Sequence, residues 1–126
     1  MERFRRQTGI QTDLRFGGDE GGPLPPEQQL QVLFILQEAL SNVRKHSEAG
    51  QVLVSVNNER DFSLLIQDDG QGYDPAEVAA RGESHVGLHI MQERAARMRA
   101  MIKLESQPGA GTRVALTLPG SERQAA

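Results

Sequence analysis

The chain has 126 residues, the size of a single domain, and 37% of them are hydrophobic, enough for a core without metals or disulfides. Because it contains no cysteine and three histidines, a disulfide scaffold, a cysteine nucleophile and a cysteine zinc site are excluded, and little scope remains for a transition-metal site built from protein ligands alone. A net charge of −3 and an aromatic content of 4% argue against a protein that coats nucleic acid or stacks on single strands.

The first third of the chain predicts a strand followed by a long helix. Residues 10–16 alternate between apolar and polar types, which is typical of a half-buried strand. The apolar side of this strand carries Ile10, Leu14 and Phe16. Residues 17–26 are rich in glycine and proline and predict a loop. Apolar residues then recur every three or four positions over 27–46 and predict a helix with Pro26 in its first turn.

The rest of the chain predicts one more helix and four short strands. In chain order these are strands at 51–57 and 62–67, a helix at 86–99, and strands at 102–106 and 113–118. Pairs of strands alternate with helices, so we expect an α/β (α+β) fold: a two-layer sandwich whose mixed, mainly antiparallel sheet is covered on one face by helices. We expect a single domain over residues 1–126, with a disordered tail at 119–126.

A first group of candidate functional residues lies near the end of the long predicted helix. Glu38, Asn42 and Lys45 or His46 are spaced so that they share one helix face. A carboxylate, an amide oxygen and a cation in this arrangement suit Mg²⁺ with attached phosphates. The alternative is a solvated helix face that carries a Glu–Lys pair.

A second group follows the apolar strand at 62–67. Asp68, Gly70 and Gly72 are spaced two residues apart. A carboxylate at a strand end can accept the exocyclic amine of adenine, and glycines let the backbone pass close to a flat ring. The alternative is an ordinary Asp-Gly turn.

Two further glycine motifs stand at element boundaries. Gly87 and Leu88 lie where a loop meets the second predicted helix, and free amides at a helix start favour a phosphate. Gly109, Gly111 and Thr112 lead into the last strand, where Thr112 can offer a hydroxyl to a ligand. The alternatives are a plain helix-entry glycine and a simple hairpin turn.

In their order and separation, the four segments resemble the nucleotide-binding motifs of the ATPase superfamily shared by gyrase, the Hsp90 chaperone, histidine kinases and mismatch-repair MutL. The resemblance covers residues 27–118 and implies a Bergerat-type fold that binds ATP and Mg²⁺. Within the superfamily, residues 37–47 and 87–95 resemble the bacterial sensor histidine kinases of the nitrate/nitrite-sensor type.

The resemblance implies a role for each matched position. Asn42 would coordinate the Mg²⁺ that bridges the ATP phosphates, and Glu38 would tune the metal or its water. Asp68 would bind the adenine amine, with Thr112 supporting the adenine side. The remaining positions are Lys45 and His46 at the phosphates, Gly70 and Gly72 shaping the pocket, and Gly87 and Leu88 offering backbone amides to the phosphates.

The resemblance also implies a mobile lid over the nucleotide at residues 73–84. His85 stands where a fuller version of the second glycine motif carries a glycine. This departure bears on how closely the amides of the lid wrap the phosphates.

Phosphoryl transfer in such a kinase requires a histidine acceptor. None of His46, His85 and His89 lies in a long helical hairpin, so we expect the acceptor on a separate dimerisation domain and this chain to be the catalytic, ATP-binding domain. We expect the domain to be monomeric, because the dimerisation helices are expected on the separate domain. We expect it to be cytoplasmic, because no segment is apolar enough to span a membrane. The parent is expected to be a homodimer in the inner (cell) membrane that signals to a response regulator, with no nucleic-acid partner.

Two alternatives belong to other functional classes. One is an anti-sigma-factor-type serine kinase. The predicted helix after Gly87 carries Met91, Glu93 and Arg94, and this pattern favours the sensor kinase over the serine kinase. The other is a non-catalytic module that only senses ATP, and the presence of Glu38, Asn42 and Asp68 argues against it.

Overall fold

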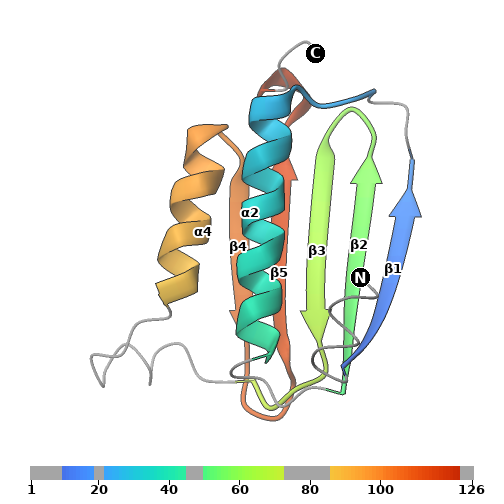
Figure 1. The fold of residues 1–126 in the computed structure, drawn as a ribbon, viewed down its shortest axis with the longest axis vertical. Coiled ribbons are helices and arrows are strands. Elements are labelled where there is room, and N and C mark those ends of the chain that lie inside the picture. Colours follow the sequence, from blue (N-terminus) through green and yellow to red (C-terminus); the bar gives the residue numbers. More distant parts are fainter. Residues whose placement is uncertain (1–9, 19–21, 45–49, 73–85, 123–126) are drawn as a thin grey trace.

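The computed structural model describes residues 10–18, 22–44, 50–72 and 86–122. Helices α2 and α4 lie on one face of a five-stranded sheet (Figure 1). The elements are β1 (Gln11–Gly17), α2 (Pro26–Asn42), β2 (Gln51–Asn58), β3 (Phe62–Asp68), α4 (Val86–Arg97), β4 (Met101–Ser106), β5 (Thr112–Leu118) and the short 3-10 helix η2 (Gly120–Glu122). The predicted two-layer sandwich is therefore confirmed.

The strand order in the sheet is β1-β2-β3-β5-β4. β1 pairs with β2 in parallel, and the other three pairs are antiparallel, so the sheet is mixed and mainly antiparallel as predicted. β3 and β5 are direct neighbours although a helix and a strand separate them in sequence, with Gln67 opposite Arg113. This pairing brings the end of β3 beside the start of β5.

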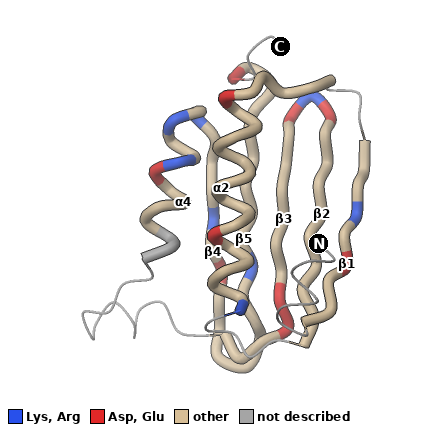
Figure 2. The backbone as a smooth tube through the Cα atoms, in the orientation of Figure 1, with Lys and Arg blue, Asp and Glu red and all other residues tan. Residues whose placement is uncertain are grey.

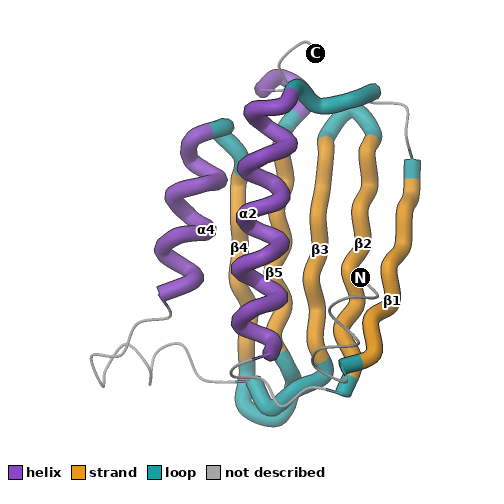
Figure 3. Tube along the Cα trace, viewed as in Figure 1, coloured by secondary structure: helices purple, strands orange, loops and turns teal. Residues whose placement is uncertain are grey.

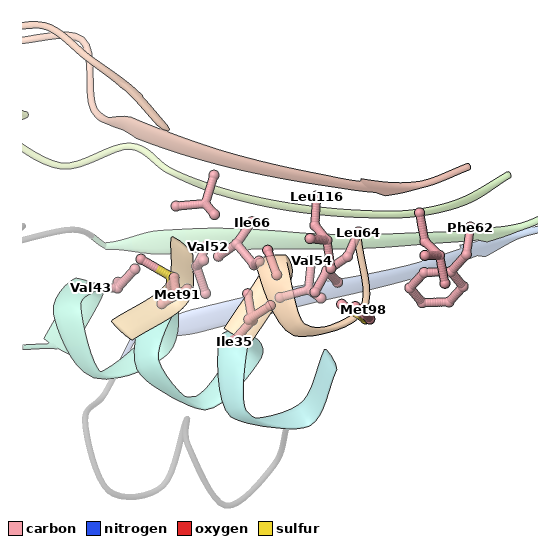
Figure 4. Close-up of a cluster of buried hydrophobic side chains, with 14 of the residues drawn as sticks. Ile35, Val43, Val52, Val54, Phe62, Leu64, Ile66, Met91, Met98 and Leu116 are labelled. Atoms are coloured by element: carbon pink, nitrogen blue, oxygen red, sulfur yellow. The ribbon is translucent and has the colours of Figure 1, made fainter. Parts of the chain in front are cut away.

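The core lies between the two helices and the sheet (Figure 4). α2 contributes Ile35 and Ala39, and Val43, which caps the end of α2, continues their spacing of four residues on the same face. α4 contributes Met91 and Ala95 with the same spacing, and Met98 lies directly after the helix. The sheet side of the core includes Val52, Val54, Phe62, Leu64, Ile66, Val114, Leu116 and Leu118. Each large apolar side chain buried here stabilises the fold by roughly 1.5–3 kcal/mol.

β1 is a strand, as the alternation predicted, but the prediction that its apolar side is half-buried is wrong for most of its length. Ile10 is buried, whereas Leu14 is 41% exposed and Phe16 is 75% exposed. Leu14 lies in register with the buried Val54 of β2, so both project from the same face of the sheet. α2 and α4 stand over the part of the sheet away from β1 (Figure 3), so neither of these two described helices covers this edge.

The start of the predicted tail carries a short 3-10 helix in the structure. Gly120–Glu122 forms η2, and Gln28 Nε2 donates a hydrogen bond to the Glu122 carbonyl oxygen (3.0 Å). Gln28 is buried on α2, so this bond ties the end of the described chain to the start of the helix. Residues 123–126 lie outside the described residues.

Candidate nucleotide-binding site

The described elements that carry predicted site residues at their ends meet at one end of the molecule, the lower end in Figure 1. α2 and β3 run toward this end, and α4 and β5 start from it. Asn42 is the last residue of α2, Asp68 ends β3, and Thr112 begins β5. Three motifs that are far apart in sequence therefore reach the same end of the sandwich.

Asp68 is a buried carboxylate, only 6% exposed. Its Oδ1 accepts a hydrogen bond from the Gly70 backbone N–H (2.8 Å), and the Thr112 backbone N–H also bonds to the carboxylate. Desolvation raises the pKa of Asp68 above 3.8, and these two backbone hydrogen bonds offset part of the rise. Because a carboxylate has about four acceptor positions, Asp68 keeps capacity for an N–H donor of a ligand.

The adjacent Asp69 has a different role. Its Oδ1 accepts hydrogen bonds from the backbone N–H groups of Gly50 and Gln51, both at 3.0 Å. These bonds join the end of β3 to the start of β2. The acidic positions at the lower end of β3 in Figure 2 are thus one carboxylate that braces the fold and one that is buried beside β5.

The glycines after β3 and before β5 let two stretches of backbone touch. Gly72 has a φ of +63°, and a Cβ there would overlap the carbonyl oxygen of Gln107. Gly111 has a φ of +77°, and a Cβ there would overlap the carbonyl oxygen of Asp68. The Gly109 N–H donates to the Gln71 carbonyl oxygen (2.6 Å). The sequence suggested glycines that approach a ligand; the described contacts of Gly72 and Gly111 are with protein backbone.

Ser106 belongs to this corner and was not among the predicted site residues. It is 8% exposed, its Oγ donates to the Gly111 carbonyl oxygen (3.2 Å), and it lies 2.9 Å from Thr112 Oγ1. The available signal was a serine at the end of a strand, directly before the Gln-Pro-Gly turn. Polar residues are common at such positions, so the pattern alone did not single it out.

The α2 residues approach the same end from the helical layer. Glu38 and Asn42 are both half-buried and lie one turn apart, on one helix face as predicted. Lys45 and His46 lie outside the described residues. The described part of the chain contains no group of three or more His, Cys, Asp or Glu residues that could hold a metal. A single amide oxygen fits Mg²⁺ bound largely through nucleotide phosphates, because Mg²⁺ seldom uses an all-protein cage.

Gly87 and Leu88 lie in the first turn of α4. Backbone N–H groups in a first turn have no partner inside the helix and can bond to an anion. The predicted lid at 73–84 and His85 lie outside the described residues.

Two open cavities lie at this end of the sheet. One, of about 600 Å³, is lined by residues of β1, β2 and β3 and includes Asp68 and Val52. The other, of about 270 Å³, lies at the β4–β5 turn and includes Ser106 and Thr112. Asp68 lines the first cavity and Thr112 lines the second, and the Thr112 backbone N–H bonds to the Asp68 carboxylate.

The arrangement is that of a nucleotide-binding ATPase domain, and comparison with known sequences agrees. Residues 27–122 match the family described as histidine kinase-, DNA gyrase B-, and HSP90-like ATPase, and the chain belongs to this family. The resemblance inferred from the four motifs is confirmed, and ATP is the nucleotide that the family implies.

Individual relatives point to one branch of the family. The chain is 37% identical over 121 residues to the sensor protein NarQ homolog of Haemophilus influenzae, an overlap that covers 94% of this chain and 21% of that protein. It is 38% identical over 95 residues to the nitrate/nitrite sensor protein NarX of Escherichia coli K12, covering 75% of this chain and 15% of that protein. The chain thus spans about a fifth or less of these relatives.

A solved structure shares the fold. The histidine kinase domain of the blue-light activated histidine kinase from Erythrobacter litoralis EL346 superposes with a TM-score of 0.72 at 18% identity. The match covers 97% of this chain and 62% of that chain.

No described helix of the present chain has the length and apolar character needed to cross a membrane.

Proposed function

We propose that this domain binds Mg-ATP and transfers the γ-phosphate to a histidine on a separate dimerisation domain of its parent protein. The observation that carries the proposal is Asp68, a buried carboxylate with spare acceptor capacity. Burying a charge is costly unless it is used or paired. The amino group of adenine is a donor that suits such an acceptor.

The other residues are assigned to the phosphate side. Asn42 supplies an oxygen to Mg²⁺, which neutralises phosphate charge when it is bound. Glu38, one turn earlier on α2, tunes the metal or its water. Lys45, His46 and the amides of Gly87 and Leu88 bind the phosphates. Gly70, Gly72 and Thr112 hold Asp68 and its surroundings in place.

The relatives support assignment to a sensor histidine kinase of the nitrate/nitrite type. Both NarX and the NarQ homolog are sensor proteins by name, and the identity extends over 75% and 94% of this chain. We therefore propose that the parent is a membrane-anchored homodimeric sensor kinase of a two-component system. In this arrangement residues 1–126 form one cytoplasmic domain, monomeric when isolated, and the parent passes phosphate to a response regulator.

The test is phosphoryl transfer in trans. The domain is incubated with Mg²⁺, ATP labelled at the γ-phosphate and the purified dimerisation domain of the parent. We expect label on the dimerisation domain that is lost in acid and kept in alkali, as phosphohistidine is. Asn42→Ala is expected to reduce transfer at least about 100-fold, because removing electrostatic support of the transferring group costs about 2.7–4 kcal/mol.

Gln37→Ala is the matched control, since Gln37 is exposed on the same helix. It is expected to transfer phosphate at the wild-type rate. Acid-stable label would instead indicate a serine kinase. ATP binding without transfer would indicate a module that only senses the nucleotide.

A further inference from the structure

The apolar side of β1 meets solvent although it belongs to the helix-bearing side of the sheet. Leu14 and Phe16 are 41% and 75% exposed, and their register with β2 places them on the side that carries α2 and α4 (Figure 1). The charged residues Asp13 and Arg15 alternate with them and project from the other side. The exposed side of β1 is therefore apolar and carries no charge at these positions.

α2 carries a second apolar stripe on its flank toward β1. Phe34 marks the opposite flank, because the guanidinium of Arg94 on α4 lies 4.3 Å from the centroid of its ring. At about 100° per residue, Leu33, Leu36 and Leu40 share the flank away from α4. Leu36 and Leu40 are partly buried against the core, and Leu33 is 47% exposed. The flank of α2 that borders the uncovered strands is thus apolar as well.

These residues indicate the kind of partner that would cover them. We call them the β1–α2 face, which consists of Leu14, Phe16, Val56, Leu33, Leu36 and Leu40. Leucines at positions i, i+3 and i+7 form the seam along which one α-helix packs against another. An exposed apolar patch of this kind marks an interaction site. The matching surface is therefore a helix with an apolar stripe.

The lower end of the β1–α2 face lies beside the nucleotide motifs. Thr12 continues the same side of β1 toward this end and stands opposite Val52, which in turn stands opposite Asp68. Two strand spacings, about 10 Å, separate the backbone at Thr12 from that at Asp68. α2 reaches the same end at Asn42. A helix that packs along the face would have one end next to the proposed ATP site.

We infer that the β1–α2 face holds a helix of the parent's dimerisation domain while the γ-phosphate is transferred. The inference rests on the proposed function, which requires a histidine on a separate helical domain to reach ATP. The chain spans 21% of the NarQ homolog and 15% of NarX, so most of a parent of this kind lies outside the present chain. Apolar packing on the face gives the affinity, and the position of its lower end brings the helix to the phosphates.

The test is phosphoryl transfer in trans at increasing concentrations of the purified dimerisation domain. Leu14→Thr/Phe16→Thr replaces two exposed apolar side chains by a residue that strands accept well. We expect the KM for the dimerisation domain to rise at least about tenfold, because burying one large apolar side chain is worth about that factor in affinity. The maximum rate should stay within about twofold, and the Kd for a non-hydrolysable ATP analogue should not change.

A second variant and a control complete the test. Leu33→Gln alters the helical part of the face and should raise the same KM without changing the Kd for the ATP analogue. Met101→Thr is the matched control, because Met101 is 62% exposed at the start of β4, the other edge strand of the sheet. It should leave the KM, the maximum rate and the Kd unchanged.

Other occupants of the face would give different results. If a second copy of this chain covered it, sedimentation would show a wild-type dimer and a monomeric Leu14→Thr/Phe16→Thr variant. If another segment of this chain covered it, urea unfolding would show a larger loss of stability in Leu14→Thr/Phe16→Thr than in Met101→Thr. Either result would overturn the inference.

The transfer measurements also separate this inference from the proposed function. A wild-type KM in either face variant would overturn the inference, and so would a loss of ATP-analogue binding together with transfer. In both cases the proposed function stands as long as the wild type transfers phosphate. A folded wild type that binds the analogue but places no label on histidine would overturn the proposed function, and this inference with it.

Discussion

Asp68 and Asp69 are adjacent acids that the fold treats differently. Asp69 is exposed, and its carboxylate accepts hydrogen bonds from the backbone N–H groups of Gly50 and Gln51. These bonds connect the end of β3 to the start of β2. Asp68 is buried, and desolvation raises its pKa although two backbone N–H groups bond to it. A fold that only needed a turn at this place would gain nothing from burying the second charge. The cost of burial is the physical argument that Asp68 serves a ligand.

The raised pKa of Asp68 predicts a pH dependence of stability. A group whose pKa is higher in the folded than in the unfolded state stabilises the fold in its protonated form, so this contribution is present below pH 3.8 and is lost as the pH rises through the raised value. Asp68→Asn cannot titrate. The wild type therefore loses stability as the pH rises across this window and Asp68→Asn does not. We expect the free energy of unfolding of Asp68→Asn to increase relative to that of the wild type.

Urea unfolding of both proteins between about pH 3 and pH 7 measures this difference. Asp13→Asn is the control, because Asp13 is an exposed residue on β1 that pairs with Arg15 at 3.0 Å. A difference between wild type and Asp68→Asn that stays constant with pH would mean that burial does not perturb this carboxylate.

At the scale of elements, the β3 end and the β4–β5 turn act as one unit. Gly72 contacts the backbone of Gln107, and Gly111 contacts the backbone of Asp68. The loop after β3 therefore cannot move away from the turn without opening the Asp68 corner. This packing fixes Asp68 and Thr112, the predicted adenine-side residues, relative to one another.

Substitution of these glycines tests the unit. Gly111→Ala should destabilise the domain by more than about 2 kcal/mol, because its Cβ meets backbone and its φ is positive. Gly109→Ala is the matched control: its φ is +79°, and nothing lies within 4 Å of its Cβ. It should cost only the backbone strain, about 1 kcal/mol. Equal losses in urea unfolding would show that the close approach at Gly111 contributes nothing.

The elements also show what the sequence could predict. The 3.6-residue pattern predicted the helix α2 but not which of its side chains are buried: Ile35 and Ala39 lie in the core, whereas Leu30 and Leu33 are each 47% exposed. Alternation in β1 predicted a strand but not its exposure. Burial of a strand depends on which strands the helices cover, and β1 is an edge strand that neither α2 nor α4 covers. Local pattern carries no information on that placement.

The sequence predicted some residues of the candidate site but not the contacts between them. The spacing of Asp68, Gly70 and Gly72 predicted a ligand corner; Asp68 is a buried carboxylate, and its contact with a ligand stays a prediction. Sequence alone did not identify Ser106, because its role arises from contacts with Gly111 and Thr112 across a turn. Nor did it predict that Gly72 contacts Gln107, since a motif does not specify which backbone packs against which.

At the scale of the whole molecule, the topology brings the nucleotide motifs to one end. The β3–β5 pairing joins Asp68 to Thr112, and the direction of α2 carries Asn42 to the same end (Figure 1). The opposite end holds the β2–β3 connection and η2. The nucleotide motifs and the β2–β3 connection therefore lie at opposite ends of the sandwich.

The central claim is that this end binds Mg-ATP through Asp68, and calorimetric titration with a non-hydrolysable ATP analogue tests it most directly. We expect saturable binding that strengthens with Mg²⁺ and weakens at least about tenfold in Asp68→Asn, because a hydrogen bond to a charged group is worth about 1.5–3 kcal/mol. Binding should be unchanged in Glu27→Gln, which alters an exposed acid in the first turn of α2. A folded domain that does not bind the analogue, or an Asp68→Asn variant that binds it as tightly as the wild type, would contradict the account.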